Sequence, residues 1–158
     1  MDDVALANYV AGTYFGNVEA GRADRDCAPL LSVEIGTPIW FSDYTLSKLR
    51  LRHGDINFQH YRHMPSLLLD GFLAKGRTET IVDLWWVTRD SYRTIGFFAA
   101  LKATKNGEVF VATFHRIQVR EARRLLKRAR REKRLVREQA NADALLRTGT
   151  DHLKKKSA

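Results

Sequence analysis

The chain has 158 residues, of which 44% are hydrophobic and 28% charged, and its formal net charge is +9 at pH 7. This apolar content is enough for a packed core, so the composition excludes an intrinsically disordered protein. No apolar run approaches the roughly 18 residues of a membrane-spanning helix, and the acidic N-terminus lacks the basic region of a signal peptide. The one cysteine, Cys27, cannot form an internal disulfide, which is typical of a reducing compartment. We therefore expect a cytoplasmic protein with no membrane partner.

The first part of the chain is predicted to be mainly helical. Ser42 or Asp43 is a suitable N-cap for a helix that Gly54 ends, and Pro65 suits the first turn of another helix. The apolar segment at 38–41 is predicted to be a short strand. The expected helices cover residues 3–14, 44–53, a piece that begins at 57, and 65–70.

The pattern then changes to a period of two residues, which is typical of strands. Asn106-Gly107 is a strong hairpin signal, so residues 93–104 and 108–116 are expected to pair antiparallel. The expected strands are 72–75, 80–88, 93–104 and 108–116. The residues expected to share one face of the last strand are Val109, Val111, Thr113 and His115.

Almost all of the excess positive charge lies in residues 118–137, which hold ten basic and two acidic side chains. So much like charge in one segment favours a polyanionic partner, and nucleic acid is the first choice. Apolar residues at helical spacing predict one long helix over 118–140, with a stripe formed by Val119, Ala122, Leu126, Ala129 and Val136.

The order of these elements predicts an α+β fold. Short N-terminal helices should pack on a small antiparallel sheet of three to four strands, followed by a long basic C-terminal helix. The predicted organisation is an N-terminal extension (1–38), an α+β domain (39–117), the basic helix (118–140) and a flexible tail (141–158).

The residue types favour chemistry without a metal or a cofactor. His60 and His63 have the spacing of two ligands on one helical face, but no cysteine or HExxH pattern accompanies them. A Gly-rich phosphate loop and a GxSxG motif are both absent from the sequence. Metal-free RNA cleavage needs a base for the ribose 2′-OH, an acid for the leaving oxygen and cations near the phosphorus. Histidine, arginine, lysine and threonine in this chain can supply all of these.

Two short segments resemble a nuclease superfamily. The run FSDYTLSKLRLRHGDI at 41–56 and the run YRHMPSLL at 61–68 are similar to phage and prophage members of the barnase, EndoU, colicin nuclease and RelE superfamily. The later VATFHR at 111–116 resembles the Thr-x-Tyr/His motif that often ends these domains. The resemblance covers residues 39–120. It implies an RNase-like fold and a toxin-like or phage-associated ribonuclease activity.

The resemblance also implies roles for single residues. His53 corresponds to the helical histidine, Lys75 or Arg77 to the basic residue of the first strand region, and Thr113 to the hydroxyl of the last strand. His115 lies where a tyrosine or histidine is common. The predicted catalytic residues are therefore His53, Arg77, Thr113 and His115. The residues predicted to contact nucleic acid are Lys75, Arg116, Arg120, Arg123, Arg124, Lys127, Arg128, Arg130, Arg131 and Arg134.

Two other interpretations stay open. The protein could bind nucleic acid, or serve a phage structural role, without cleaving RNA. It could also be an assembly protein that docks the stripe of its basic helix on a protein partner. The expected partners are RNA, including tRNA or ribosomal RNA, a protein held by the C-terminal helix, and an inhibitor protein. A nuclease should bring the four predicted catalytic residues into one cleft, whereas a binding protein would leave them scattered.

Trp85 and Trp86 are neighbours in a predicted strand, so their side chains should point to opposite faces. One of them is expected in the core. The other is expected either under a helix or at the surface as a platform for base stacking.

Overall fold

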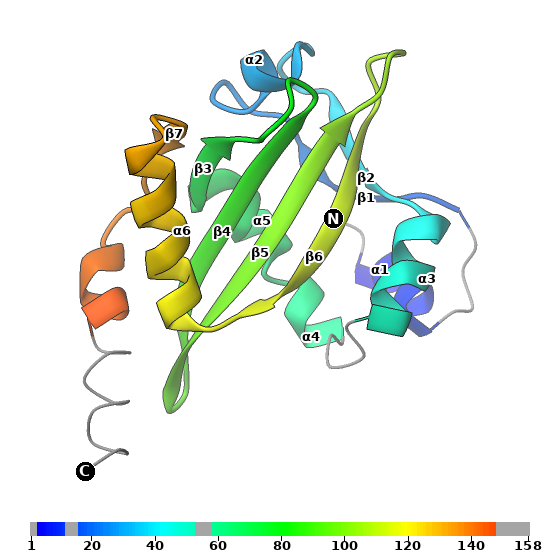
Figure 1. The fold of residues 1–158 in the computed structure, drawn as a ribbon. Helices are drawn as coiled ribbons and strands as arrows, with labels where there is room; N and C mark the ends of the chain where they lie inside the picture. The colour runs from blue at the N-terminus through cyan, green and yellow to red at the C-terminus, as the bar shows by residue number, and fades with distance from the viewer. Residues whose placement is uncertain (1–2, 12–15, 53–57, 148–158) are drawn as a thin grey trace.

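The computed structural model shows a chain folded around one seven-stranded mixed sheet (Figure 1). The structure describes residues 3–11, 16–52 and 58–147. The strands lie in the order β1-β2-β6-β5-β4-β3-β7, in which β2 and β6 pair in parallel and the other neighbours pair antiparallel. The strands are β1 (Val18–Arg22), β2 (Pro38–Phe41), β3 (Phe72–Lys75), β4 (Ile81–Asp90), β5 (Arg93–Ala103), β6 (Val109–Ile117) and β7 (Leu135–Arg137). The helices are α1 (Asp3–Ala11), α2 (Ala28–Leu31), α3 (Asp43–Arg52), α4 (Phe58–Tyr61), α5 (Met64–Asp70) and α6 (Val119–Arg131), and residues 142–147 are also helical.

The predicted central hairpin is confirmed. β5 and β6 pair antiparallel, and Gly107 takes a left-handed φ of 78° in the turn between them. Glycine adopts this conformation without the steric penalty that a Cβ atom brings. The predicted sheet of three to four antiparallel strands is wrong, however. β1 and β2 extend the sheet beyond β6, β7 extends it beyond β3, and the β2–β6 pair makes it mixed.

β1 lies inside the segment that was expected to be an N-terminal extension, residues 1–38. Its Val18 and Ala20 are buried in the same core cluster as β4 and β5 side chains. β2 and β6 share only two residue pairs, Ile39 with Val109 and Trp40 with Phe110. Such a short parallel pairing joins segments about 70 positions apart in the sequence, so no local pattern indicates it.

The long basic helix predicted over 118–140 is also wrong. α6 ends at Arg131, and Lys133 then takes a left-handed φ of 56°. The backbone N–H of Arg134 donates to the carbonyl of Ala129 at 2.8 Å, which is the hydrogen bond that closes a Schellman-type helix end. The chain reverses there, and β7 pairs antiparallel with β3. Residues that continue the basic run therefore cover a sheet edge instead of prolonging a helix.

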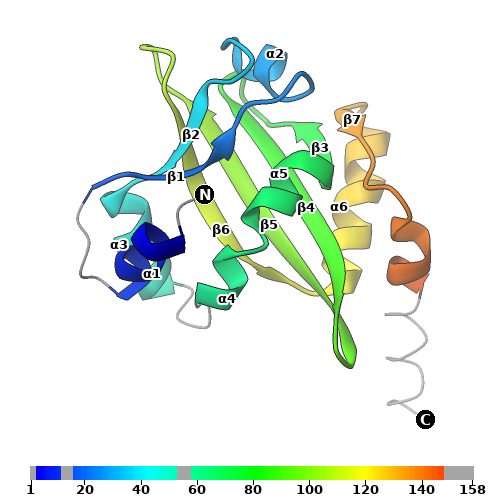
Figure 2. The same cartoon turned by 180° about the vertical axis from the view of Figure 1, so that it is seen from behind.

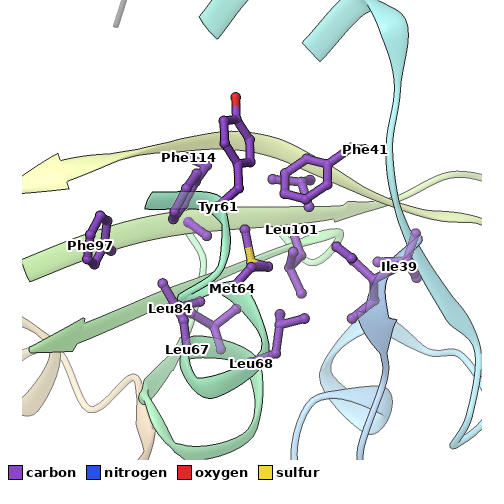
Figure 3. Packing of buried hydrophobic residues seen from close by; sticks show 14 of the residues in the cluster. Ile39, Phe41, Tyr61, Met64, Leu67, Leu68, Leu84, Phe97, Leu101 and Phe114 are labelled. Carbon is purple, nitrogen blue, oxygen red and sulfur yellow. The ribbon is translucent and has the colours of Figure 1, made fainter. Parts of the chain in front are cut away.

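Helices α4 and α5 lie over one face of the sheet, and α1 and α3 lie beside its β6 edge (Figure 2). The main core lies between these helices and the sheet (Figure 3). The ring of Tyr61 lies 5.3 Å from that of Phe41 and 5.4 Å from that of Phe114, measured between centroids. Phe114 in turn stacks on Phe97 at 5.6 Å. Burying a side chain of this size contributes about 1.5–3 kcal/mol to stability, so this aromatic row is a main source of the free energy of folding.

The opposite face of the sheet carries α6. Four residues of the predicted stripe are buried against the sheet, namely Val119, Ala122, Leu126 and Ala129. Val136, the fifth, belongs to β7 and is 42% exposed. Trp85 packs beneath α6 and stacks on Phe72 at 5.2 Å, whereas Trp86 packs against the core on the other side. The two tryptophans therefore point to opposite faces, as predicted.

A β-bulge at Ala112 decides which side chains of β6 share a face. Ala100 pairs with Thr113 but Leu101 pairs with Val111, so β6 has one extra residue at this point. A bulge reverses the alternation of the strand that contains it. Val111 is consequently buried in the main core, while Thr113 points to the face that carries α6. The prediction that Val109 and Val111 share a face with Thr113 and His115 is therefore wrong.

Helix α3 lies beside this bulge. The hydroxyl of Thr45 donates to the carbonyl of Val111 at 2.8 Å, and the ammonium of Lys48 donates to the carbonyl of Ala112. β2 has already left β6 at this point, so the two α3 side chains satisfy carbonyls that have no neighbouring strand.

Candidate nucleic-acid interface

Part of the sheet face that carries α6 has no described helix above it. α6 contacts β4, β5 and β7, and Figure 1 shows β6 and much of β5 beside it without a covering element. The side chains on this area are half-buried, apart from the exposed Lys102. We call them the open face: Trp40, Phe98, Ala100, Lys102, Phe110, Thr113 and His115.

The open face is built in rows that run across the strands, because residues paired in register point to the same side of a sheet. The first row is Glu19, Trp40, Phe110, Lys102 and Ile81, in which Glu19 forms an ion pair with Arg22 at 2.9 Å. The second is Thr113, Ala100 and Asp83, and the third is His115, Phe98 and Trp85. The first row is not covered by a described helix. The third row extends beneath α6, where Phe98 packs against the side chains buried between α6 and the sheet.

Two of the four predicted catalytic residues, Thr113 and His115, come together on the open face. They are two positions apart on one strand, which places their Cα atoms about 7 Å apart. The His115 ring lies 5.3 Å from that of Phe98, and its Nδ1 lies 3.1 Å from the carbonyl oxygen of Arg116. The ring is therefore held by packing on one side and by the backbone on the other.

The other two predicted catalytic residues are not brought to this place. Arg77 lies in the exposed loop between β3 and β4, at one end of the sheet. Together with Lys75 and Glu79 it lines a cavity of about 420 Å³ that also touches α2. His53 lies outside the described residues.

Asp83 is a residue that the sequence analysis missed. Its side chain is 24% exposed, it shares a row with Thr113, and its carboxylate lies 3.7 Å from Nη1 of Arg134. Burial raises the pKa of this carboxyl above its usual value, while Arg134 and then Arg77 act in the opposite direction. A charged residue inside the otherwise uncharged run TIVDLWWVT was the available signal.

The basic residues of the C-terminal region divide into two groups. The first group is held by other parts of the protein. Arg123 donates to the carbonyl of Leu146 at 2.6 Å, Arg128 and Arg130 pair with Glu132 and Glu138, and Arg134 contacts Asp83, Glu132 and the carbonyl of Lys75. These four arginines fix the helix end, β7 and the segment 142–147 in place.

The second group forms what we call the outer strip: Arg120, Arg124, Lys127 and Arg131. All four are exposed, and none forms an ion pair with a carboxylate within residues 3–11, 16–52 or 58–147. They follow one another by four, three and four positions, so they lie on one side of the helix, opposite the buried stripe. The strip is about 16 Å long at the helical rise per residue.

Arg116, which was predicted to contact nucleic acid, lies on the other face of the sheet. It is paired in register with Phe97, which is paired with Trp86. His63 lies 4.8 Å from the Phe97 ring and 5.4 Å from the Trp86 ring, and His60 lies 5.8 Å from Phe97. The His60-x-x-His63 spacing thus places both rings on the sheet, where burial lowers the pKa of His63 and Asp90 opposes that shift.

Within the described part of the chain, no group of three or more potential ligands is placed to hold a metal ion. Within the same residues, no helix is both long enough and apolar enough to cross a membrane.

The chain matches no protein-family model, and comparison with curated proteins and with solved structures finds no significant match. The interface is therefore interpreted from its own geometry.

Proposed function

We propose that this protein binds RNA through the outer strip of α6. One observation carries the proposal. The outer strip points away from the protein along one side of the helix, and no carboxylate among the residues that the structure describes forms an ion pair with it. Unpaired cations in a row attract a polyanion and release its counterions on binding. Since the chain has a single cysteine and so no internal disulfide, we place this binding in a reducing compartment, the cytoplasm.

The apolar stripe of α6 argues against the assembly interpretation. Val119, Ala122, Leu126 and Ala129 are buried against the protein's own sheet, so they are not available to a partner helix. A protein partner or an inhibitor would instead meet the cationic side of the helix, and it would have to be acidic.

The test is the salt dependence of RNA affinity. Each phosphate neutralised on a single strand contributes about −0.7 to the slope of log affinity against log salt. Replacing all four strip residues with glutamine should therefore flatten the slope by about three units. A matched control changes four exposed cations elsewhere: Arg25, Arg89, Arg93 and Lys105. This control removes the same charge and should leave the slope nearly unchanged. Equal slopes for the strip variant and the wild type would contradict the proposal.

RNA cleavage is a second proposal, favoured by the position of Thr113 and His115 on the same open face. A histidine can move the proton of the ribose 2′-OH, and a hydroxyl on a rigid strand can donate to the phosphate. Arg77 lies away from this pair in the β3–β4 loop, which favours binding over cleavage. Incubation with RNA in EDTA distinguishes the two. Cleavage at this face should yield a 2′,3′-cyclic phosphate and should fall by about two to four orders of magnitude in His115→Ala. Intact RNA would leave binding as the function.

A further inference from the structure

We propose that the open face stacks the unpaired bases of single-stranded RNA, with Trp40 and Phe110 as the main platform. The inference rests on the proposed function, since it requires RNA to be held nearby by α6. It adds the class of nucleic acid that the protein selects.

The aromatic rings of the open face occur as two cross-strand pairs. Trp40 and Phe110 are direct neighbours across the parallel β2–β6 pair, and Phe98 and His115 are direct neighbours across β5 and β6, with ring centroids 5.3 Å apart. Phe98 is four positions from Lys102, which extends the row of Trp40 and Phe110. The two pairs are therefore separated by about 13 Å along the strands.

The two faces of these strands treat their aromatic residues differently. Phe97 and Phe114 point to the helix-covered core and are fully buried. Phe98 and Phe110 point to the α6 face and keep part of their surface exposed. A sheet face whose only neighbour is water usually carries polar side chains. Rings that are seated in a rigid sheet but still accessible offer flat apolar surfaces to a ligand that stacks.

Charge identifies the ligand as a nucleic acid strand. Lys102 is exposed beside Phe110 in the same row, and the outer strip lies on the neighbouring helix. On the edge of α6, Arg124 and Arg128 border a small hollow with Glu121 and Leu125. Cations near half-buried rings match a ligand that alternates phosphates with aromatic bases. A duplex keeps its bases paired and stacked, so only a single strand can use the rings.

Tryptophan fluorescence reports on this site directly. Trp85 is only 1% exposed beneath α6, and Trp86 lies on the other side of the sheet. Stacking of a base on Trp40 should quench its emission when single-stranded RNA is added. The quenching should disappear in Trp40→Phe and persist in Trp86→Phe. Inorganic polyphosphate, which has charge but no bases, should bind without quenching.

Affinity gives the second measurement. A base–aromatic stack contributes about 1–3 kcal/mol, so Trp40→Leu and Phe110→Leu should each weaken single-stranded RNA binding by about ten- to a hundredfold. Leucine keeps an apolar side chain at each position, which protects folding. Tyr92→Leu is the matched control, because Tyr92 is 93% exposed on the distant β4–β5 turn. Affinity for duplex RNA and for polyphosphate should not change in any of the three variants.

The outcomes separate this inference from the proposed function. If the wild type binds polyphosphate and duplex RNA as tightly as single strands, and without quenching, then stacking is wrong while binding through α6 stands. If the two leucine variants weaken polyphosphate binding equally, the rings act only through the fold, and stacking is again wrong. If the wild type binds none of the three polyanions, both proposals fall.

Discussion

The side-chain amide of Gln139 pairs with both backbone polar groups of Val87. The Val87 N–H donates to Oε1 at 2.9 Å, and Nε2 donates to the Val87 carbonyl at 2.7 Å. The pairing of β3 with β4 ends with Phe72, the first residue of β3, opposite Trp85, so Val87 lies two positions beyond the last paired residue of β4. Gln139 thus supplies the donor and the acceptor that a longer strand would have supplied, and its side chain is buried to do so.

Replacing Gln139 with leucine should lower the free energy of unfolding by about 2–3 kcal/mol, because it leaves a buried donor and a buried acceptor without partners. Urea denaturation measures this change. Gln118→Leu is the control, since Gln118 is exposed and its side chain forms no capping hydrogen bond. Gln139→Glu adds a sharper test. Its carboxylate cannot donate to the Val87 carbonyl, so this variant should regain stability as acid protonates it. Equal stability of wild type and Gln139→Leu would show that the paired amide contributes nothing.

Arg137 joins β7 to the rest of the protein. Its side chain is 14% exposed and donates to the carbonyls of Gly71 and Leu68, both at 2.8 Å, and to the carboxylates of Asp24 and Asp26 at 3.0 and 3.2 Å. We expect Arg137→Met to cost about 3 kcal/mol of stability, because it removes the cation beside two carboxylates and leaves two carbonyls without their donor.

The control for Arg137 is Arg22→Met. Arg22 pairs with Glu19 at 2.9 Å, but its side chain is 65% exposed, and an exposed pair contributes about 1 kcal/mol or less. The stability of Arg137→Lys should lie between that of the wild type and that of Arg137→Met, since lysine keeps the charge but lacks the planar set of donors that arginine has. Thermal denaturation of the three variants measures the order, and a result in which Arg22→Met is the least stable would contradict this account.

Cys27 is predicted to be an unreactive thiol in the folded protein. Burial, together with Asp24, raises its pKa from 9.0 to about 12, and Arg137 opposes the shift. A thiolate is the reacting species, so alkylation near pH 8 should be about a thousandfold slower in the folded protein than in urea. Mass spectrometry after iodoacetamide treatment measures the two rates. Similar rates in the two conditions would show that the thiol is accessible, and would reopen a chemical role for Cys27.

His63 should make stability depend on pH. Its pKa in the folded protein is lowered by burial, despite the opposing charge of Asp90, while in the unfolded chain it is near 6.5. Between these two values the unfolded state binds more protons than the folded state, so acidification favours unfolding. The stability that the neutral ring contributes is fully present above about pH 6.5 and is lost as the pH falls through the lowered value.

His63→Phe removes the proton site but keeps a ring against Phe97 and Trp86. The loss of stability between about pH 8 and pH 5 should therefore be smaller in this variant than in the wild type. Urea denaturation at both pH values measures the difference. An identical loss in the two proteins would mean that the acid sensitivity arises from other groups.

Local sequence patterns determined much of the secondary structure. The Asn106-Gly107 turn with alternating flanks predicted the β5–β6 hairpin, and the apolar spacing from Val119 to Ala129 predicted the buried side of α6. These features depend on contacts between residues close in the chain, so their periodicity is visible in the sequence. The concentration of positive charge in residues 118–137 was also fixed by the sequence alone.

The tertiary structure decided what these elements do. Residues 135–137 form a strand because they pair with the free edge of β3. The bulge at Ala112 places Thr113 on the opposite face from the one that strict alternation predicts. Partners far away in the sequence hold Arg123, Arg134 and Arg137, which leaves other basic residues facing outward. Strand pairing and ion pairing join segments that no local period connects, so neither the open face nor the outer strip could be read from the sequence. Composition established that the chain is basic, but only the packing of distant segments established which cations can reach a partner.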